Sequence, residues 1–108
     1  MTYQQGDIIF RKVNSIPRGA KRIKDFPIIV AQGETTGHAH KVLEEVKAFL
    51  DERENTRDED GRKVMYLEGP ATVVHEEHGT VNLPEGIYMV DHVKEYDHFL
   101  EESRQLRD

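Results

Sequence analysis

The chain has 108 residues, enough for one domain with a single hydrophobic core but not for two. Its composition of 36% hydrophobic, 33% charged and 7% aromatic residues favours a compact barrel or sandwich over a helical bundle. The net charge of -6 argues against a protein that binds nucleic-acid phosphates, and the absence of cysteine excludes disulfides and thiolate zinc sites.

Two strands are predicted in the N-terminal third. Residues 7–13 and 26–31 are rich in β-branched and aromatic side chains, and Pro27 must lie at a strand start or edge because proline cannot donate to a ladder. The basic residues between them are interpreted as a solvated loop. The chain contains no apolar run long enough for a membrane helix or a signal sequence, so we expect a cytoplasmic protein without membrane contact.

The middle of the chain is predicted to turn and then extend. Glycine and threonine in residues 33–37 favour a tight turn that delivers a strand carrying His38 and His40. Residues 41–50 fit a helical and a strand period equally well, and the neighbouring segments favour a strand. Residues 51–61 are almost all charged residues and turn formers, which predicts an exposed loop.

The C-terminal half is predicted to hold further strands in residues 63–68, 71–75, 80–83 and 87–93. A break at Gly69-Pro70 separates the first two, and the turn Pro84-Glu85-Gly86 separates the last two. The charged tail 94–108 fits a short amphipathic helix or an extended segment. The fold expected from these segments is therefore an all-β barrel or sandwich formed by one domain, residues 1–108.

Two histidine pairs are the most distinctive chemical feature of the chain. His38 and His40 point to one face if they lie on a strand, because side chains alternate with a period of two. A tight hairpin would place His75 and His78 opposite each other, although Glu76-Glu77 is poor turn chemistry for a two-residue loop. If the pairs meet, four imidazoles could bind a divalent transition metal, for which donors converge to about 2.0–2.2 Å. The alternative is that these are ordinary surface histidines.

Other side chains near the pairs are weaker candidates. Glu44 and His92 are possible additional metal ligands, and His92 fits a partly buried structural histidine equally well. Glu34, Glu76 and Glu77 are candidate catalytic bases, with a solvated surface charge as the alternative for each.

The spacing of the first pair resembles the first motif of the cupin family. Gly33, His38, His40 and Glu44 follow the glycine, His-x-His and glutamate of that motif to within one residue. The second cupin motif, glycine, Pro-x-Gly and histidine, is matched in part.

In the second motif, Gly79 and Pro84-Glu85-Gly86 match, but Met89 stands where the histidine belongs. His92, or the pair His75 and His78, would have to replace it. The resemblance implies an antiparallel β-barrel with Fe, Mn, Ni or Zn bound inside by histidines and a carboxylate. It does not imply a reaction, because cupins include both enzymes and binding proteins.

Three functions are consistent with these residues. The first, and the one we expect, is a metalloenzyme, a hydrolase, isomerase or oxygenase, that acts on a small polar substrate. The second is a non-catalytic binding or regulatory module stabilised by a closed metal site. The third is a metal-free structural or interaction protein. Exposed strand edges would allow a homodimer in each case.

Overall fold

The computed structural model describes residues 2–32, 37–58 and 61–93. These residues form eight strands and one short 3-10 helix: β1 (Thr2–Gln5), β2 (Ile8–Val13), β3 (Ala20–Ile23), β4 (Ile28–Gln32), β5 (Ala39–Val42), β6 (Ala48–Asp51), η1 (Glu54–Thr56), β7 (Met65–Val74) and β8 (Val81–His92). Every strand pair is antiparallel, so the predicted all-β antiparallel fold class is confirmed.

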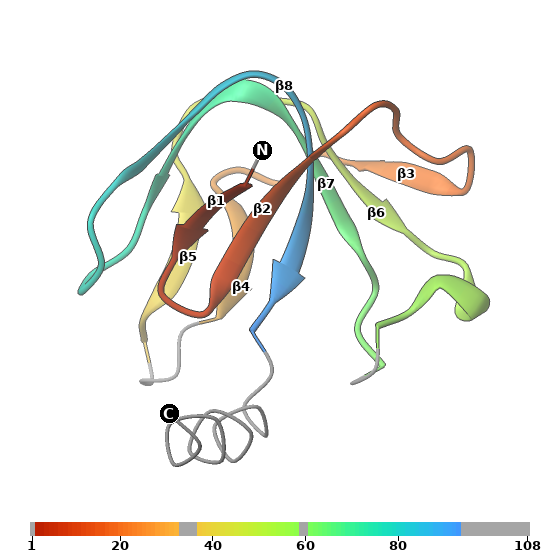
Figure 1. The fold of residues 1–108 in the computed structure, drawn as a ribbon, viewed down its shortest axis with the longest axis horizontal. Helices are drawn as coiled ribbons and strands as arrows, with labels where there is room; N and C mark the ends of the chain where they lie inside the picture. Colours follow the sequence, from red (N-terminus) through yellow and green to blue (C-terminus); the bar gives the residue numbers. More distant parts are fainter. Residues whose placement is uncertain (1, 33–36, 59–60, 94–108) are drawn as a thin grey trace, which may run out of the picture.

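One branched sheet contains all eight strands. The main path runs β1-β2-β8-β7-β5-β4, and β6 joins β7 to β3. The first half of β7 pairs with β6 and its second half with β5, while β8 follows its other edge. Figure 1 shows the sheet curling as β7 and β8 arch together over the molecule. No pairing among the described strands links β3 or β4 back to β1, so the sheet is curved without closing into a barrel.

Two of the predicted strand breaks are wrong, because β7 and β8 are each continuous through them. Gly69-Pro70 lies inside β7, and Pro84-Glu85-Gly86 lies inside β8. Gly69 faces Gly86 across the ladder, and the register shifts between Gly69 and Ala71. The turn-forming residues therefore bend two paired strands at the same level and do not end them, because cross-strand pairing continues on both sides of the irregularity.

Two other strands were missed in the sequence. β1 has a polar sequence without strand periodicity, yet it pairs along its length with β2. β3 includes Lys21 and Arg22, which were interpreted as part of a solvated loop. Both side chains are exposed, but their backbone pairs with β6. Charged side chains on such an outer strand discourage pairing with other chains.

The remaining segments are placed as follows. The ambiguous segment 41–50 is divided, since β5 ends at Val42 and β6 begins at Ala48. Asp51, the first residue of the expected charged loop, is the last residue of β6 and is buried beneath the guanidinium of Arg53, 2.9 Å away. The expected C-terminal helix lies outside the described residues.

Buried side chains of the described strands form one hydrophobic core. Its fully buried members come from β2, β5, β6, β7 and β8 and include Ile8, Phe10, Val42, Leu67 and Tyr88. Within the part of the chain that the structure describes, no helix has the length and hydropathy needed to cross a membrane.

Candidate metal centre

The structure brings the two histidine pairs together where β5 meets the end of β7. These strands pair with Lys41 opposite Val74, and one further step in that register places His40 opposite His75. The ring centroids of His40 and His75 are 4.4 Å apart, and that of His38 is 5.7 Å from His75. The ring of His78 is 4.6 Å from His75 and 6.1 Å from His40. We call these four residues the histidine cluster.

The second pair reaches the cluster by a different route from the one predicted. Residues 75–80 form a six-residue connection between β7 and β8, so no tight hairpin closes between the histidines. The Nδ1 atom of His75 accepts a hydrogen bond from the backbone N–H of Glu77 at 3.0 Å. His78 lies against Gly6, where an added Cβ would be 2.5 Å from Nε2 of the ring. The glycine therefore leaves room for the imidazole.

A buried carboxamide fixes the protonation of His40. Gln5 is 2% exposed, and its Nε2 donates to the carbonyl oxygens of Val73 and Gly79, each at 2.9 Å. Its Oε1 therefore faces the Nδ1 of His40, 2.8 Å away. Because Oε1 can only accept, Nδ1 carries the proton and Nε2 keeps its lone pair.

Two buried ring nitrogens in the cluster lack hydrogen bonds to any described residue: Nδ1 of His38 and Nε2 of His40. The nearest carboxylates are those of Glu77, 3.4 Å from the first, and Asp7, 3.5 Å from the second. Neither contact has hydrogen-bond geometry. Burial and the neighbouring His75 lower the pKa of His40, against an opposing contribution from Asp7. His40 is therefore neutral near pH 7, with a free lone pair.

One carboxylate takes part in the cluster. Glu76 accepts a hydrogen bond from the backbone N–H of Ala39 at 2.8 Å, which lowers its pKa and keeps it ionised. His38, His75 and Glu76 each offer one ligand atom, and these three atoms lie within 4.8 Å of one another. Two imidazoles and a carboxylate form a donor set that suits a borderline transition metal.

Two predicted site residues lie away from the histidine cluster, and a third is outside the described residues. Glu44 accepts a hydrogen bond from the backbone N–H of Thr72 on β7. His92 ends β8 and lines a separate pocket, where burial and the guanidinium of Arg62 lower its pKa. Glu34 lies outside the described residues. Glu77, a predicted catalytic base, lies beside His38 and is 61% exposed.

Sequence reasoning missed Gln5 and Asp7, the two residues nearest to the nitrogens of His40. Neither belongs to a pattern with metal-ligand spacing; Gln5 precedes the first predicted strand, and Asp7 is the first residue of that strand. Only the pairing of β1 with β2 and the fold of β2 against β8 bring them to the cluster.

Comparison with known proteins identifies one family. A family described as Domain of unknown function (DUF8820) matches residues 4–92, which include the whole histidine cluster. No curated protein and no solved structure gives a significant match. The predicted membership of the cupin family is wrong, since the matching family is a different one. The second histidine pair also comes from the connection 75–80, whereas Met89, at the cupin histidine position, lines the separate pocket on β8.

Proposed function

The chain belongs to the DUF8820 family of domains of unknown function, and we propose that it binds a divalent transition metal at the histidine cluster. We further propose that the metal site is catalytic and acts on a small polar molecule. Zn, Fe, Mn and Ni are the candidate metals, because all accept imidazole and carboxylate ligands.

The observation that carries this proposal is a pair of buried ring nitrogens, on His38 and His40, that have no hydrogen-bond partner among the described residues. Leaving a buried polar atom without a partner costs about 1–3 kcal/mol. One of these atoms belongs to His40 on β5 and the other to His38, which immediately precedes that strand. Beside a third imidazole and an ionised carboxylate, they have the chemistry of a ligand set. A cation would use the lone pairs and offset that cost.

His38, His75 and Glu76 are the proposed first ligands, because their donor atoms are already within 4.8 Å of one another. His40 and His78 adjoin them and supply further imidazoles. Two histidines with one carboxylate match the ligand type of Fe(II) enzymes that use dioxygen. A set extended by His40 is closer to a zinc site.

Solvent access supports a catalytic site over a closed one. Glu76, Glu77 and His78 are exposed, while His40 is buried, so the cluster is open on one side only. A metal with an open position activates water or polarises a substrate. The carboxylate of Glu77 lies close enough to His38 to act as a base on that open side.

A structural metal is the alternative, and one observation favours it. The cluster joins β5 to the connection 75–80, and Gln5 links it to β1. A metal bound by all four histidines would hold these distant segments together in a small polar domain. That site would have no open position and no catalytic activity.

Elemental analysis of the untagged protein tests metal binding. We expect about one equivalent of Fe, Mn, Ni or Zn in the wild type and in His92→Ala, whose histidine lies outside the cluster. The double variant His38→Ala/His40→Ala should contain none. Absence of metal from the wild type, even after incubation with each of the four ions, would refute the proposal.

Removal of the metal with a chelator separates the two roles. A catalytic site should leave the circular dichroism spectrum of the folded sheet unchanged, and the Co(II)-substituted protein should show an exchangeable water. Unfolding on chelation, with no exchangeable water, would favour the structural alternative.

A further inference from the structure

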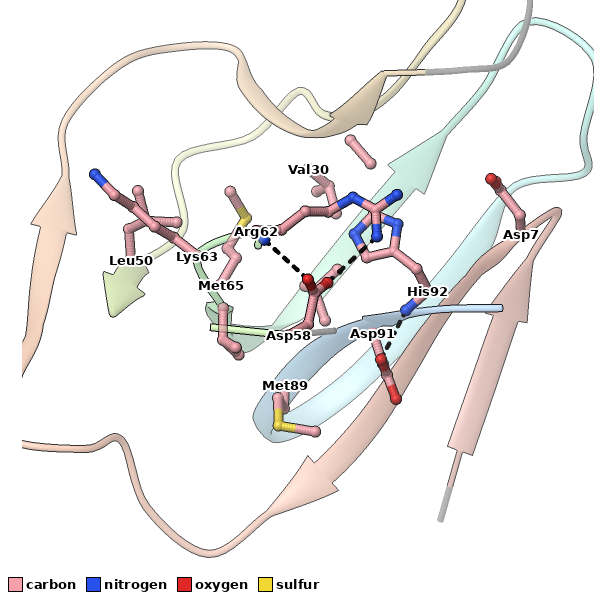
Figure 2. A pocket seen from close by; sticks show the side chains of 13 residues that line it. Asp7, Val30, Leu50, Asp58, Arg62, Lys63, Met65, Met89, Asp91 and His92 are labelled. Carbon is pink, nitrogen blue, oxygen red and sulfur yellow. Dashed lines mark hydrogen bonds and ion pairs between the residues drawn. The ribbon is translucent and has the colours of Figure 1, made fainter. Parts of the chain in front are cut away.

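A pocket of about 540 Å³ lies beside the histidine cluster, a volume typical of sites for small organic ligands. Its inner surface includes apolar side chains from four strands: Val30, Leu50, Met65, Met89 and Val90. Figure 2 shows Met65 and Met89 on one side of this space and Asp7 and His92 on the other. The lining therefore combines apolar side chains with polar and charged ones.

The pocket and the cluster share a wall. Asp7 lines the pocket, and its Oδ1 is 3.5 Å from Nε2 of His40. Ala31 also lines the pocket and is the residue opposite His40 in the pairing of β4 with β5. A ligand in the pocket thus lies next to the proposed metal site.

Most of the charged side chains that line the pocket are already neutralised by ion pairs. Arg62 binds Asp58 at 3.3 Å, Lys63 binds Glu52 at 2.6 Å, and Asp91 binds Arg11 at 3.0 Å. By contrast, Asp7 makes no ion pair with a lysine or arginine among the described residues, and its side chain is 36% exposed. Its carboxylate is the one lining charge left uncompensated within that part of the chain.

We infer that this pocket binds a small molecule with an apolar body and a protonated amine, with the amine at Asp7 and the body against Met65 and Met89. The inference rests on the proposed function, since it assigns a substrate class to the same site. An ammonium group supplies three donors and the charge that Asp7 lacks. The methionines adapt to apolar bodies of varied shape because their side chains are flexible and polarizable.

Binding of n-hexylamine, 1-hexanol and hexanoate to the chelator-treated protein tests the inference. The methyl signals of Met65 and Met89, labelled with carbon-13, report occupancy of the pocket by NMR. We expect saturable shifts of both signals with hexylamine, and binding about tenfold weaker for hexanol and weaker still for hexanoate.

Three variants locate the amine. Asp7→Asn should weaken hexylamine binding about tenfold, whereas Asp7→Glu, which keeps the charge, should retain the preference for amine over hexanoate. Asp25→Asn removes an equal charge from an exposed loop residue and should bind hexylamine as the wild type does.

Two results would overturn the inference. Hexanoate binding as tight as or tighter than hexylamine binding, or unchanged hexylamine binding in Asp7→Asn, would show that Asp7 does not bind the amine. An absence of saturable shifts at Met65 and Met89 would show that the pocket does not bind these ligands. Because these titrations use metal-free protein, their failure is distinguishable from a failure of metal binding.

Discussion

At the scale of single residues, Gln5 decides what His40 can bind. Its carboxamide is oriented by two backbone carbonyls, so its oxygen faces Nδ1 of His40 and leaves the lone pair on Nε2. A metal-binding imidazole commonly depends on such a partner at its other nitrogen. We therefore expect Gln5→Glu to weaken metal binding by about 10–100-fold, because a carboxylate cannot donate to these carbonyls and favours a doubly protonated ring.

Metal titration and nitrogen-15 NMR of His40 would measure these effects separately. Gln4→Glu is the matched control, since Gln4 is the exposed neighbour and its amide binds only the carbonyl of Gly6 in the described structure. The control should keep both the affinity and the Nδ1-protonated form of His40. Wild-type values in Gln5→Glu would show that the carboxamide has no positioning role.

At the scale of elements, the bend in β7 and β8 depends on the close approach of two backbones. A Cβ added at Gly69 would lie 2.2 Å from the carbonyl oxygen of Pro84. Because backbone atoms of paired strands cannot move apart without breaking ladder bonds, we expect Gly69→Ala to lower the free energy of unfolding by about 1–3 kcal/mol. Gly79→Ala meets nothing within 4 Å and serves as the control. The urea midpoint of Gly79→Ala should lie near that of the wild type. A wild-type midpoint for Gly69→Ala would contradict the close approach of the two backbones.

At the scale of the whole molecule, histidines held neutral make stability depend on pH. Burial lowers the pKa of His92, with a further lowering by Arg62, so the folded state binds a proton less readily than the unfolded state. The unfolded state takes up that proton below about pH 6.5, so stability falls as the pH drops through this value. We expect the urea midpoint of the metal-free protein to decrease between pH 7.5 and pH 5.5. The decrease should be smaller in His92→Gln, and an equal decrease would exclude His92 as a contributor.

The local pattern of residues was sufficient for part of this architecture. β2 and β4 are found within one or two residues of the predicted segments, because β-branched runs bounded by turn formers favour strands wherever they pack. The strand predicted to carry both histidines of the first pair begins at Ala39, so it contains His40 but not His38. The breaks predicted at Gly69-Pro70 and at residues 84–86 were wrong because glycine and proline mark a bend in a paired strand as well as its end.

What the sequence alone determined about this protein is local: an all-β antiparallel chain, in which β-branched runs mark strands such as β2 and β4. What only the tertiary structure decided is which segments meet. The register of β5 with β7 placed His40 beside His75, and the fold of the sheet brought Gln5 to Nδ1 and Asp7 to Nε2 of His40. The physical reason is that side-chain periodicity depends on neighbouring residues, whereas strand pairing is selected by the burial of one common core.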